Sequence, residues 1–357
     1  MRERMTPKER VLTAFAHQEP DHVPTWLGAS PGFRAKAVRE LDLPDDESLS
    51  RLVGDDFRRV YARYAGPEEM SPTANLPPGV TYRSVFGVLR HGYEGGMAIS
   101  YPLAHAETVA EVDAYPWPDP AWMDVSQIRA DAAPSCQHYA ILGGDWSQFW
   151  HDALDLLGME NMMIKMFEAP AVVDAVLTHV VDYYEGVNQR IFEAAADVID
   201  IFFIGNDFGS QNGPLLGERQ FRRFIVPPLK RLTDLGHRYG LKVLLHCCGG
   251  FAPLIPAMIE AGVDGLQALQ PNCRGMDPQK LKTEFGQDML LMGAINTQLI
   301  IEGTPEQVRA ETRRILEIMM PGGGYVACPS HDYVLPETPV QNVLAVYEAI
   351  REFGGYM

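Results

Sequence analysis

The sequence is poor in positive charge and has no long apolar run. Its 357 residues include 30 Lys and Arg against 47 Asp and Glu, a formal net charge of −17. A surface of this sign repels phosphate backbones and anionic lipids, which argues against nucleic acid and membranes as partners. No stretch approaches the ~20 consecutive apolar residues of a bilayer span, and the charged residues 1–10 have no apolar segment behind them. We therefore expect a cytoplasmic protein.

Cysteine is also scarce, with five residues in the chain. An odd number of cysteines in a long chain without a signal peptide argues against a disulfide framework and favours thiol or metal chemistry. Cys247 and Cys248 are adjacent, whereas Cys136 and Cys273 are most simply structural. Hydrophobic residues make up 46% of the chain, enough for a large core. Since no repeat or low-complexity linker interrupts it, we predict one domain over residues 1–357.

Capping signals predict helices at both ends of the chain. Thr6-Pro7-Lys8-Glu9 combines a Thr N-cap, Pro at the first helical position and Glu at the third, and predicts a helix that ends near His17. The same kind of signal predicts a helix over residues 304–320, and another opens at residue 338. We interpret the Pro-, Gly- and aromatic-rich stretch up to about residue 130 as early elements elaborated by insertions.

From residue 138 onward, short apolar runs alternate with helical patterns. This alternation is typical of βα units in a parallel sheet. At this chain length it fits a single (β/α)8 TIM barrel with an N-terminal helical extension and insertions. The predicted strands cover residues 138–142, 198–203, 241–245, 265–269, 289–292 and 325–327.

The side chains that follow these strands should share one face of the barrel, where such folds place their chemistry. If this rim served only to connect strands and helices, turn-forming residues such as Gly, Asn and Asp would be enough. The His, Cys and Gln residues found there therefore indicate a further role. His246 and Cys248, two residues apart at a strand end, can point the same way and close on one ion. Cys328, at the end of the last predicted strand, supplies a third soft ligand.

One imidazole and two thiolates suit zinc and leave a fourth position for substrate, as in catalytic zinc sites. The alternative is that the cysteines are buried only as small hydrophobic residues. Cys247 is expected to point away from the site, into the packing layer.

At these residues the sequence resembles the uroporphyrinogen decarboxylase superfamily, whose members are (β/α)8 barrels. The resemblance spans nearly the whole chain, although fold alone does not fix function. Its markers are Asp21-His22-Val23-Pro24, Pro102-Leu103, Tyr115-Pro116-Trp117-Pro118, Asn206-Asp207, His246-Cys247-Cys248-Gly249, Gly293-Ala294-Ile295-Asn296-Thr297-Gln298 and Pro329-Ser330-His331.

Two branches of this superfamily compete. Decarboxylases of uroporphyrinogen carry an Arg-rich loop after the first strand, which binds the many carboxylates of the substrate. Here that loop, residues 26–34, keeps only Arg34, so a polycarboxylate would meet repulsion instead of bidentate capture. A decarboxylase of a smaller acid stays open, as does a barrel that binds a small molecule without turnover.

The other branch contains zinc methyltransferases, whose marker of His-x-Cys and a distant Cys is matched by His246, Cys248 and Cys328. The resemblance implies methyl transfer between a small methylated or methoxylated substrate, or a thiol, and a corrinoid. Because the chain has no Asp-x-His-x-x-Gly cobalamin motif, a separate partner protein must carry that corrinoid. Relatives often form homodimers, and this point stays open.

The polar ring around the mouth suggests a small hydroxylated or methoxylated molecule as ligand. His331 and Asp207 are the candidates for catalysis, although Asp207 could equally cap a turn or helix, and Asn296 could equally orient a loop through Asx-type bonds. The candidates for substrate binding are Asp145, Asn206, Gln211, Asn296 and Gln298.

Overall fold

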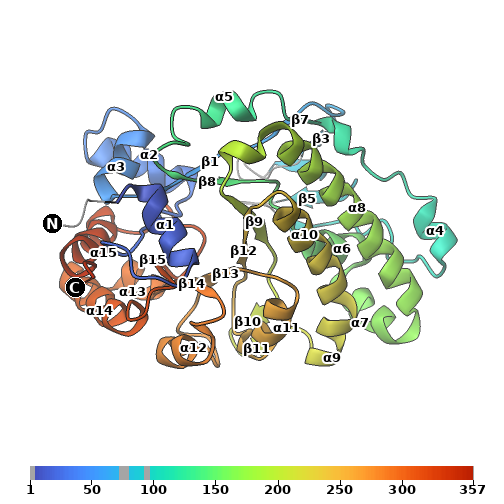
Figure 1. Cartoon of the computed structure of the whole chain (residues 1–357). Coiled ribbons are helices and arrows are strands. Elements are labelled where there is room, and N and C mark those ends of the chain that lie inside the picture. Colours follow the sequence, from blue (N-terminus) through green and yellow to red (C-terminus); the bar gives the residue numbers. More distant parts are fainter. Residues whose placement is uncertain (1–4, 72–79, 92–96, 357) are drawn as a thin grey trace.

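The computed structural model describes residues 5–71, 80–91 and 97–356, and its centre is a curled parallel sheet surrounded by helices (Figure 1). The strands follow one another in the order β1-β8-β9-β12-β13-β14-β15, and every neighbouring pair is parallel. These strands are β1 (Phe57–Arg59), β8 (Ala140–Gly143), β9 (Ile201–Gly205), β12 (Lys242–His246), β13 (Gly265–Leu269), β14 (Leu290–Ile295) and β15 (Tyr325–Pro329). The predicted (β/α)8 barrel is confirmed.

Residues 24–26 close the barrel between its first and last strands. Thr25 forms a parallel bridge with Ala327 of β15, and Ala327 N donates to Pro24 O at 2.8 Å. On the other side, Asp56 N, just before β1, donates to Thr25 O at 2.9 Å. This short segment therefore takes the place of an eighth strand.

A buried carboxylate holds the closing segment. Asp56 Oδ2 accepts from Thr25 N at 2.8 Å, and Asp56 Oδ1 accepts from Arg10 Nη1 at 3.3 Å. Arg10 Nε also donates to Asp21 Oδ1 at 2.6 Å, which ties the first helix to the same place. Burial raises the pKa of Asp56 to about 7, against the opposing effects of the Thr25 N–H and the Arg10 charge.

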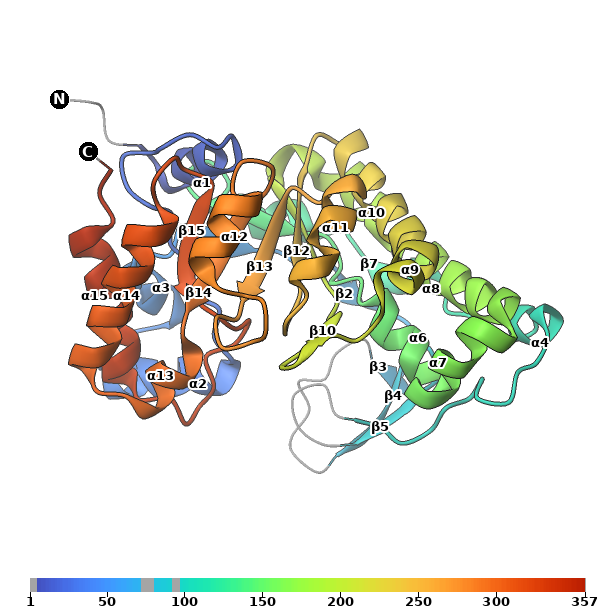
Figure 2. The same ribbon diagram turned by 90° about the horizontal axis from the view of Figure 1, so that it is seen from below.

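Helices cover the outside of the sheet (Figures 1 and 2). Along each strand, side chains alternate between the barrel interior and the helical layer, so two apolar clusters form, one on each side of the sheet. The helices are α1 (Pro7–Phe15), α2 (Pro31–Glu40), α3 (Asp46–Val53), α4 (Val109–Asp113), α5 (Ile128–Ala132), α6 (Phe149–Leu157), α7 (Met159–Glu168), α8 (Pro170–Ala195), α9 (Glu218–Gln220), α10 (Val226–Arg238), α11 (Ile255–Glu260), α12 (Pro278–Phe285), α13 (Thr297–Glu302), α14 (Pro305–Met319) and α15 (Val340–Phe353).

The insertions carry small sheets of their own. One is a four-stranded sheet with the order β3-β4-β5-β6. The other two are antiparallel pairs, one of β2 with β7 and one of β10 with β11. Their strands are β2 (Arg63–Tyr64), β3 (Met70–Ser71), β4 (Thr81–Ser84), β5 (Leu89–His91), β6 (Met97–Ala98), β7 (Met123–Asp124), β10 (Gly209–Ser210) and β11 (Gly213–Pro214).

The predicted elements agree with the structure except at their ends. α1 and α14 both carry the complete capping box, and α15 starts directly after Pro339. Most of the predicted strands end too early, because backbone pairing continues through Gly143, Gly205 and His246. His246 is therefore the last residue of β12 and not the first residue of a loop.

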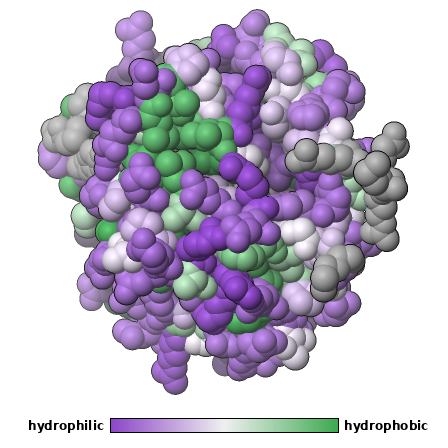
Figure 3. All heavy atoms as spheres, turned by 90° about the vertical axis from the view of Figure 1, so that its left-hand side faces the viewer, coloured by the Kyte–Doolittle hydropathy of each residue, from purple (hydrophilic) through white to green (hydrophobic). Residues whose placement is uncertain are grey.

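The outer surface is mainly polar. Seen from the side of α14 and α15, it is largely hydrophilic and interrupted by separate apolar patches (Figure 3). Within the described ranges, even the 26-residue α8 lacks an apolar stretch that could cross a membrane.

The closing carboxylate should be important for stability. Asp56→Ala leaves the buried Thr25 N–H without its acceptor and removes the contact of Arg10 Nη1, and we expect the free energy of unfolding to fall by about 2–4 kcal/mol. Asp56→Asn keeps one oxygen for Thr25 N and should cost less. Urea denaturation measures both, with the exposed Asp46→Ala as control. Wild-type stability of Asp56→Ala would contradict this account of barrel closure.

Candidate metal centre at the barrel mouth

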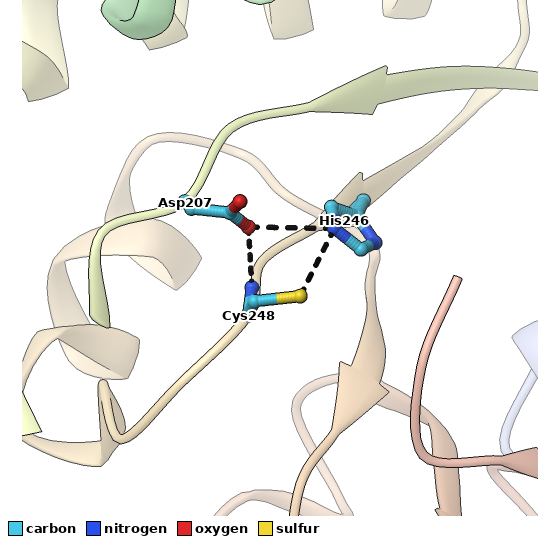
Figure 4. A group of neighbouring side chains, drawn as sticks. All are labelled: Asp207, His246 and Cys248. Atoms are coloured by element: carbon cyan, nitrogen blue, oxygen red, sulfur yellow. Dashed lines mark hydrogen bonds and ion pairs between the residues drawn. The ribbon is translucent and has the colours of Figure 1, made fainter. Parts of the chain in front are cut away.

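Three potential ligand atoms meet where β9 and β12 end. A carboxylate oxygen of Asp207, an imidazole nitrogen of His246 and Cys248 Sγ all lie within 4.8 Å of one another (Figure 4). His246 Nε2 is 3.3 Å from Asp207 Oδ1 and 3.4 Å from Cys248 Sγ. In the described part of the chain, no other group of His, Cys, Asp and Glu side chains has a spacing that suits one metal ion.

Strand register brings these residues together. Gly205 of β9 pairs with His246 of β12, and the ladder continues as Asn206 N donates to His246 O at 3.0 Å. Asp207 and Cys248, each two residues further along, therefore lie opposite each other. Cys248 N donates to Asp207 Oδ1 at 2.7 Å, which fixes the carboxylate beside the thiol.

Gln267 of β13 fixes the orientation of His246. His246 Nδ1 lies 2.5 Å from Gln267 Oε1. Because an amide oxygen only accepts, Nδ1 carries a proton, and Nε2 is the nitrogen that faces Asp207 and Cys248. Burial acts to lower the pKa of His246, but Cys248 and Asp207 outweigh it and raise the pKa, so Nε2 donates to these two groups until a metal ion replaces its proton and leaves the Nδ1–H tautomer that a metal-binding histidine needs. The ring centroids of His246 and Trp146 lie 5.3 Å apart.

Asp207 is held as an anion between two histidines. Its Oδ2 is 3.4 Å from Nε2 of His151, a residue of α6, while its Oδ1 faces His246. Burial acts to raise the pKa of Asp207, but the hydrogen bonds and charges of His151 and His246 outweigh it and hold the pKa well below its usual value. The carboxylate is therefore ionised at neutral pH.

The histidines beside Cys248 make its thiol more acidic. Burial acts to raise the pKa of its thiol, but the charge and hydrogen bond of His246, together with a hydrogen bond to His331, outweigh it and lower the pKa. The same contact with Cys248 is the main cause that raises the pKa of His331, against the effect of burial. The structure thus places His331, predicted as catalytic, directly beside the sulfur.

Cys328, predicted as the third metal ligand, lies outside this group. Its side chain is fully buried in the apolar cluster that fills the barrel, together with Trp26 and Phe203. Burial raises the pKa of the Cys328 thiol well above its usual value, and the nearby Asp332 adds to the effect. Asp207, predicted as catalytic, is the third member of the group that could hold a metal ion. Metal binding by Cys328 stays a prediction.

The remaining cysteines belong to the core. Cys247 is fully buried in the outer apolar cluster, as predicted, and its Sγ accepts from Phe208 N at 3.4 Å. Cys136 and Cys273 are also buried, and all five cysteines are free thiols. Cys248 is the most accessible of the five.

Two of the predicted substrate-binding residues support the loop before α6. Asn206 is fully buried, its Nδ2 donates to Ser147 O at 3.1 Å, and its Oδ1 accepts from Trp150 N at 2.9 Å. Both ends of its amide are therefore engaged with backbone. Asp145 Oδ1 accepts from Ser147 N at 3.1 Å, and burial raises the pKa of this carboxyl.

The other three lie further along the rim. Asn296 is the N-cap of α13, and its Oδ1 accepts from Leu299 N at 3.2 Å. Asn272 Nδ2 donates to Asn296 Oδ1 at 3.0 Å and to Gln298 Oε1 at 2.9 Å. Gln211 is exposed in the turn between β10 and β11. Contacts of these residues with a substrate stay predictions.

Sequence reasoning missed two residues that hold the centre in place. Gln267 could have been found from the sequence, because it is a polar residue in the middle of an otherwise apolar strand. In the structure it is fully buried. His151 had no such signal, since it lies among apolar and acidic residues of α6 and reaches Asp207 only through the fold.

The fold and the centre together define a (β/α)8 barrel with an Asp-His-Cys cluster at its mouth. Residues 148–353 match the family described as Uroporphyrinogen decarboxylase (URO-D), which is more than half of the chain. The chain belongs to this family.

Curated relatives and a solved structure are similar to this chain. Methylcobamide:CoM methyltransferase MtbA of Methanosarcina acetivorans is 22% identical over 193 residues, which cover 53% of this chain and 51% of the relative. MtbA of Methanosarcina mazei is 22% identical over 195 residues, with the same coverage. The chain thus spans about half the length of these relatives. A solved methyltransferase from Methanosarcina mazei shares the fold, with a TM-score of 0.71, 19% identity and coverage of 98% of this chain and 99% of that one.

Gly205 is required for the position of Trp146. A Cβ at Gly205 would lie 2.0 Å from Trp146 Cε2, so Gly205→Ala must displace the indole from His246. We expect a loss of about 1–3 kcal/mol in the free energy of unfolding. A changed near-ultraviolet circular dichroism spectrum should accompany it. Gly217→Ala, where a Cβ would meet nothing within 4 Å, is the control. An unchanged spectrum in Gly205→Ala would show that Trp146 does not depend on this glycine.

Proposed function

We propose that this protein is a zinc-dependent methyltransferase that moves a methyl group between a small methylated or methoxylated substrate, or a thiol, and a corrinoid carried by a partner protein. The observation that carries the proposal is the pairing of His246 Nε2, oriented by Gln267, with the low-pKa thiol of Cys248. The two curated relatives are named methylcobamide:CoM methyltransferases, and their names support methyl transfer as the reaction.

The donor set fits zinc. Nitrogen, sulfur and carboxylate oxygen are the ligands that zinc accepts, whereas magnesium and calcium take oxygen alone. His246 and Cys248 supply two of these donors, and the third is Cys328, as the family resemblance implies, or Asp207, as the distances favour. Three protein ligands leave a fourth position for substrate.

Zinc bound there would lower the pKa of a substrate thiol, or polarise a methoxy oxygen so that it leaves more readily. The side chains of the protein prepare this chemistry. Gln267 and His151 orient the ligands from behind, as is usual around metal sites. His331 Nδ1 lies 3.1 Å from Tyr333 N and 3.2 Å from Tyr333 O, and these contacts hold the ring beside Cys248.

The structure gives no comparable support to a decarboxylase of the uroporphyrinogen type. Arg34, the one arginine left in the substrate loop, is engaged within the protein. Its Nη1 donates to Asp46 Oδ2 at 3.1 Å and its Nη2 to Leu27 O at 2.9 Å. A guanidinium with these partners is not free to bind a carboxylate of a substrate.

Metal analysis tests the ligand set. Purified wild-type protein should contain about one zinc per chain, and His246→Ala and Cys248→Ala should lose most of it, because each removes a ligand. Elemental mass spectrometry measures the content, and Cys273→Ala, which removes a buried thiol outside the group, is the control.

The variants Asp207→Ala and Cys328→Ala decide the third ligand. The distances lead us to expect the larger loss of zinc affinity in Asp207→Ala. The reverse result would assign the position to Cys328. Full zinc content in both His246→Ala and Cys248→Ala would contradict the proposed centre.

An assay of methyl transfer tests the reaction itself. Zinc-loaded protein is mixed with methylcobalamin and a small thiol, and the loss of methylcobalamin absorbance and the mass of the methylated thiol are followed. We expect the rate to fall by about 100-fold or more in Cys248→Ala, with wild-type rates in Cys273→Ala. Equal activity of metal-free protein would overturn the proposal. Carbon dioxide release from an organic acid would instead favour a lyase.

A further inference from the structure

An arginine at the end of β1 points into the barrel mouth. Phe57 belongs to the apolar cluster inside the barrel, so alternation along the strand directs Arg58 outward and Arg59 inward. The ring contacts of Arg59 agree with this direction. Its Cζ lies 5.0 Å from the ring centroid of Phe203 and 5.1 Å from that of Trp146, both of which face the interior.

Arg58 and Arg59 differ in their partners. Arg58 forms a bidentate ion pair, since its Nε and Nη2 donate to the two carboxylate oxygens of Glu47 at 2.8 and 2.9 Å. Arg59 Nε is buried and has no hydrogen-bond partner. Within residues 5–71, 80–91 and 97–356, no carboxylate lies within ion-pair distance of Arg59; its other contacts are aromatic rings, including that of Tyr61 at 4.8 Å.

A guanidinium without an anionic partner, packed among aromatic rings at the mouth, is expected to bind an anion. Aromatic faces stabilise the cation only in part, and a desolvated positive charge is costly unless it is paired. The charge of Arg59 reaches Asp145, but the carboxyl of Asp145 accepts from Ser147 N and does not pair with the arginine. The planar guanidinium group of Arg59 is therefore available to bind a ligand.

Trp146 connects this arginine to the metal centre. Its ring centroid lies 5.1 Å from Arg59 Cζ and 5.3 Å from that of His246. A small molecule that lies along Trp146 can thus contact the guanidinium with one end and the Asp207-His246-Cys248 group with the other. Its middle part would pack against aromatic carbon.

We propose that Arg59 is the substrate-binding residue of this mouth, and that it takes the carboxylate, sulfonate or phosphate group of a small organic acid. The proposal rests on the proposed function in one respect, namely that the bound acid is the methyl donor or acceptor. Arginine suits this role because its two parallel N–H groups match two oxygens of an oxyanion. The proposal names the chemical class of the substrate, which the metal centre alone does not define.

Binding of matched thiols tests the proposal. The probes are 3-mercaptopropionate, 2-mercaptoethanesulfonate and 2-mercaptoethyl phosphate, with neutral 2-mercaptoethanol for comparison, measured by titration calorimetry on the full-length protein. We expect at least one anion to bind wild type about tenfold or more tightly than the neutral thiol. The preferred anion identifies the oxyanion. Equal binding of 2-mercaptoethanol, or no binding of any anion, would overturn the proposal.

Variants assign the preference to Arg59. Arg59→Gln should abolish it, and Arg59→Lys should keep only part of it, because lysine offers a point charge without the planar fork. Arg63→Gln, which removes an exposed arginine nearby in the sequence, is the matched control. Since Arg59 has no anion partner to lose, Arg59→Gln should melt within about 2 °C of wild type. A preference that survives in Arg59→Gln would refute the assignment.

Measurements on metal-depleted protein separate this proposal from the proposed function. Arg59 does not belong to the ligand group, so its preference for anions should persist without zinc. If methyl transfer fails but the preference depends on Arg59, the anion site stands and the proposed reaction falls. If methyl transfer succeeds at the same rate in Arg59→Gln, with no change in KM, Arg59 does not bind the reacting substrate.

Discussion

Closure of the parallel sheet at Thr25 decides where every functional side chain lies. Without it, β1 and β15 would be the two edges of an open sheet, and their residues Arg59 and Cys328 would be far apart. The backbone bonds of Pro24 and Trp26 to Ala327 of β15, the bond from Asp56 N to Thr25 O, and the Asp56 carboxylate join the edges. Because all strands run the same way, their carboxyl ends then open on one mouth.

Among the residues that the structure describes, the ionised Asp207 and the acidic Cys248 have oppositely charged neighbours at this mouth, whereas Arg59 has none. Asp207 lies between His151 and His246, and Cys248 lies between His246 and His331. These contacts overcome a burial that would otherwise neutralise the carboxylate and the thiol. Arg59 lacks such a partner, so the protein alone does not complete the electrostatics of its own mouth. Sites of this kind commonly give up some stability for binding.

Membership of the URO-D family does not by itself define the chemistry, since one fold serves many reactions. The side chains at the mouth, which differ between proteins of one fold, decide which reaction is supported. The loop that would capture a polycarboxylate has kept one arginine, which is engaged with Asp46, whereas His246 and Cys248 stand ready as soft ligands. The proposed metal centre, together with Arg59, which has no anionic partner among the described residues, leads us to propose a small, singly acidic substrate.

What the sequence determines by itself is local. Capping boxes such as Thr6 with Glu9, and the apolar runs of the strands, act over a few residues, and the spacing of His246 and Cys248 places two ligands on one strand end. The tertiary structure alone decided that Asp207 joins this pair, that Gln267 sets the tautomer of His246, and that Arg59 faces inward without an anion. These facts depend on the register between strands and on packing across the barrel, which join residues that are distant in the chain.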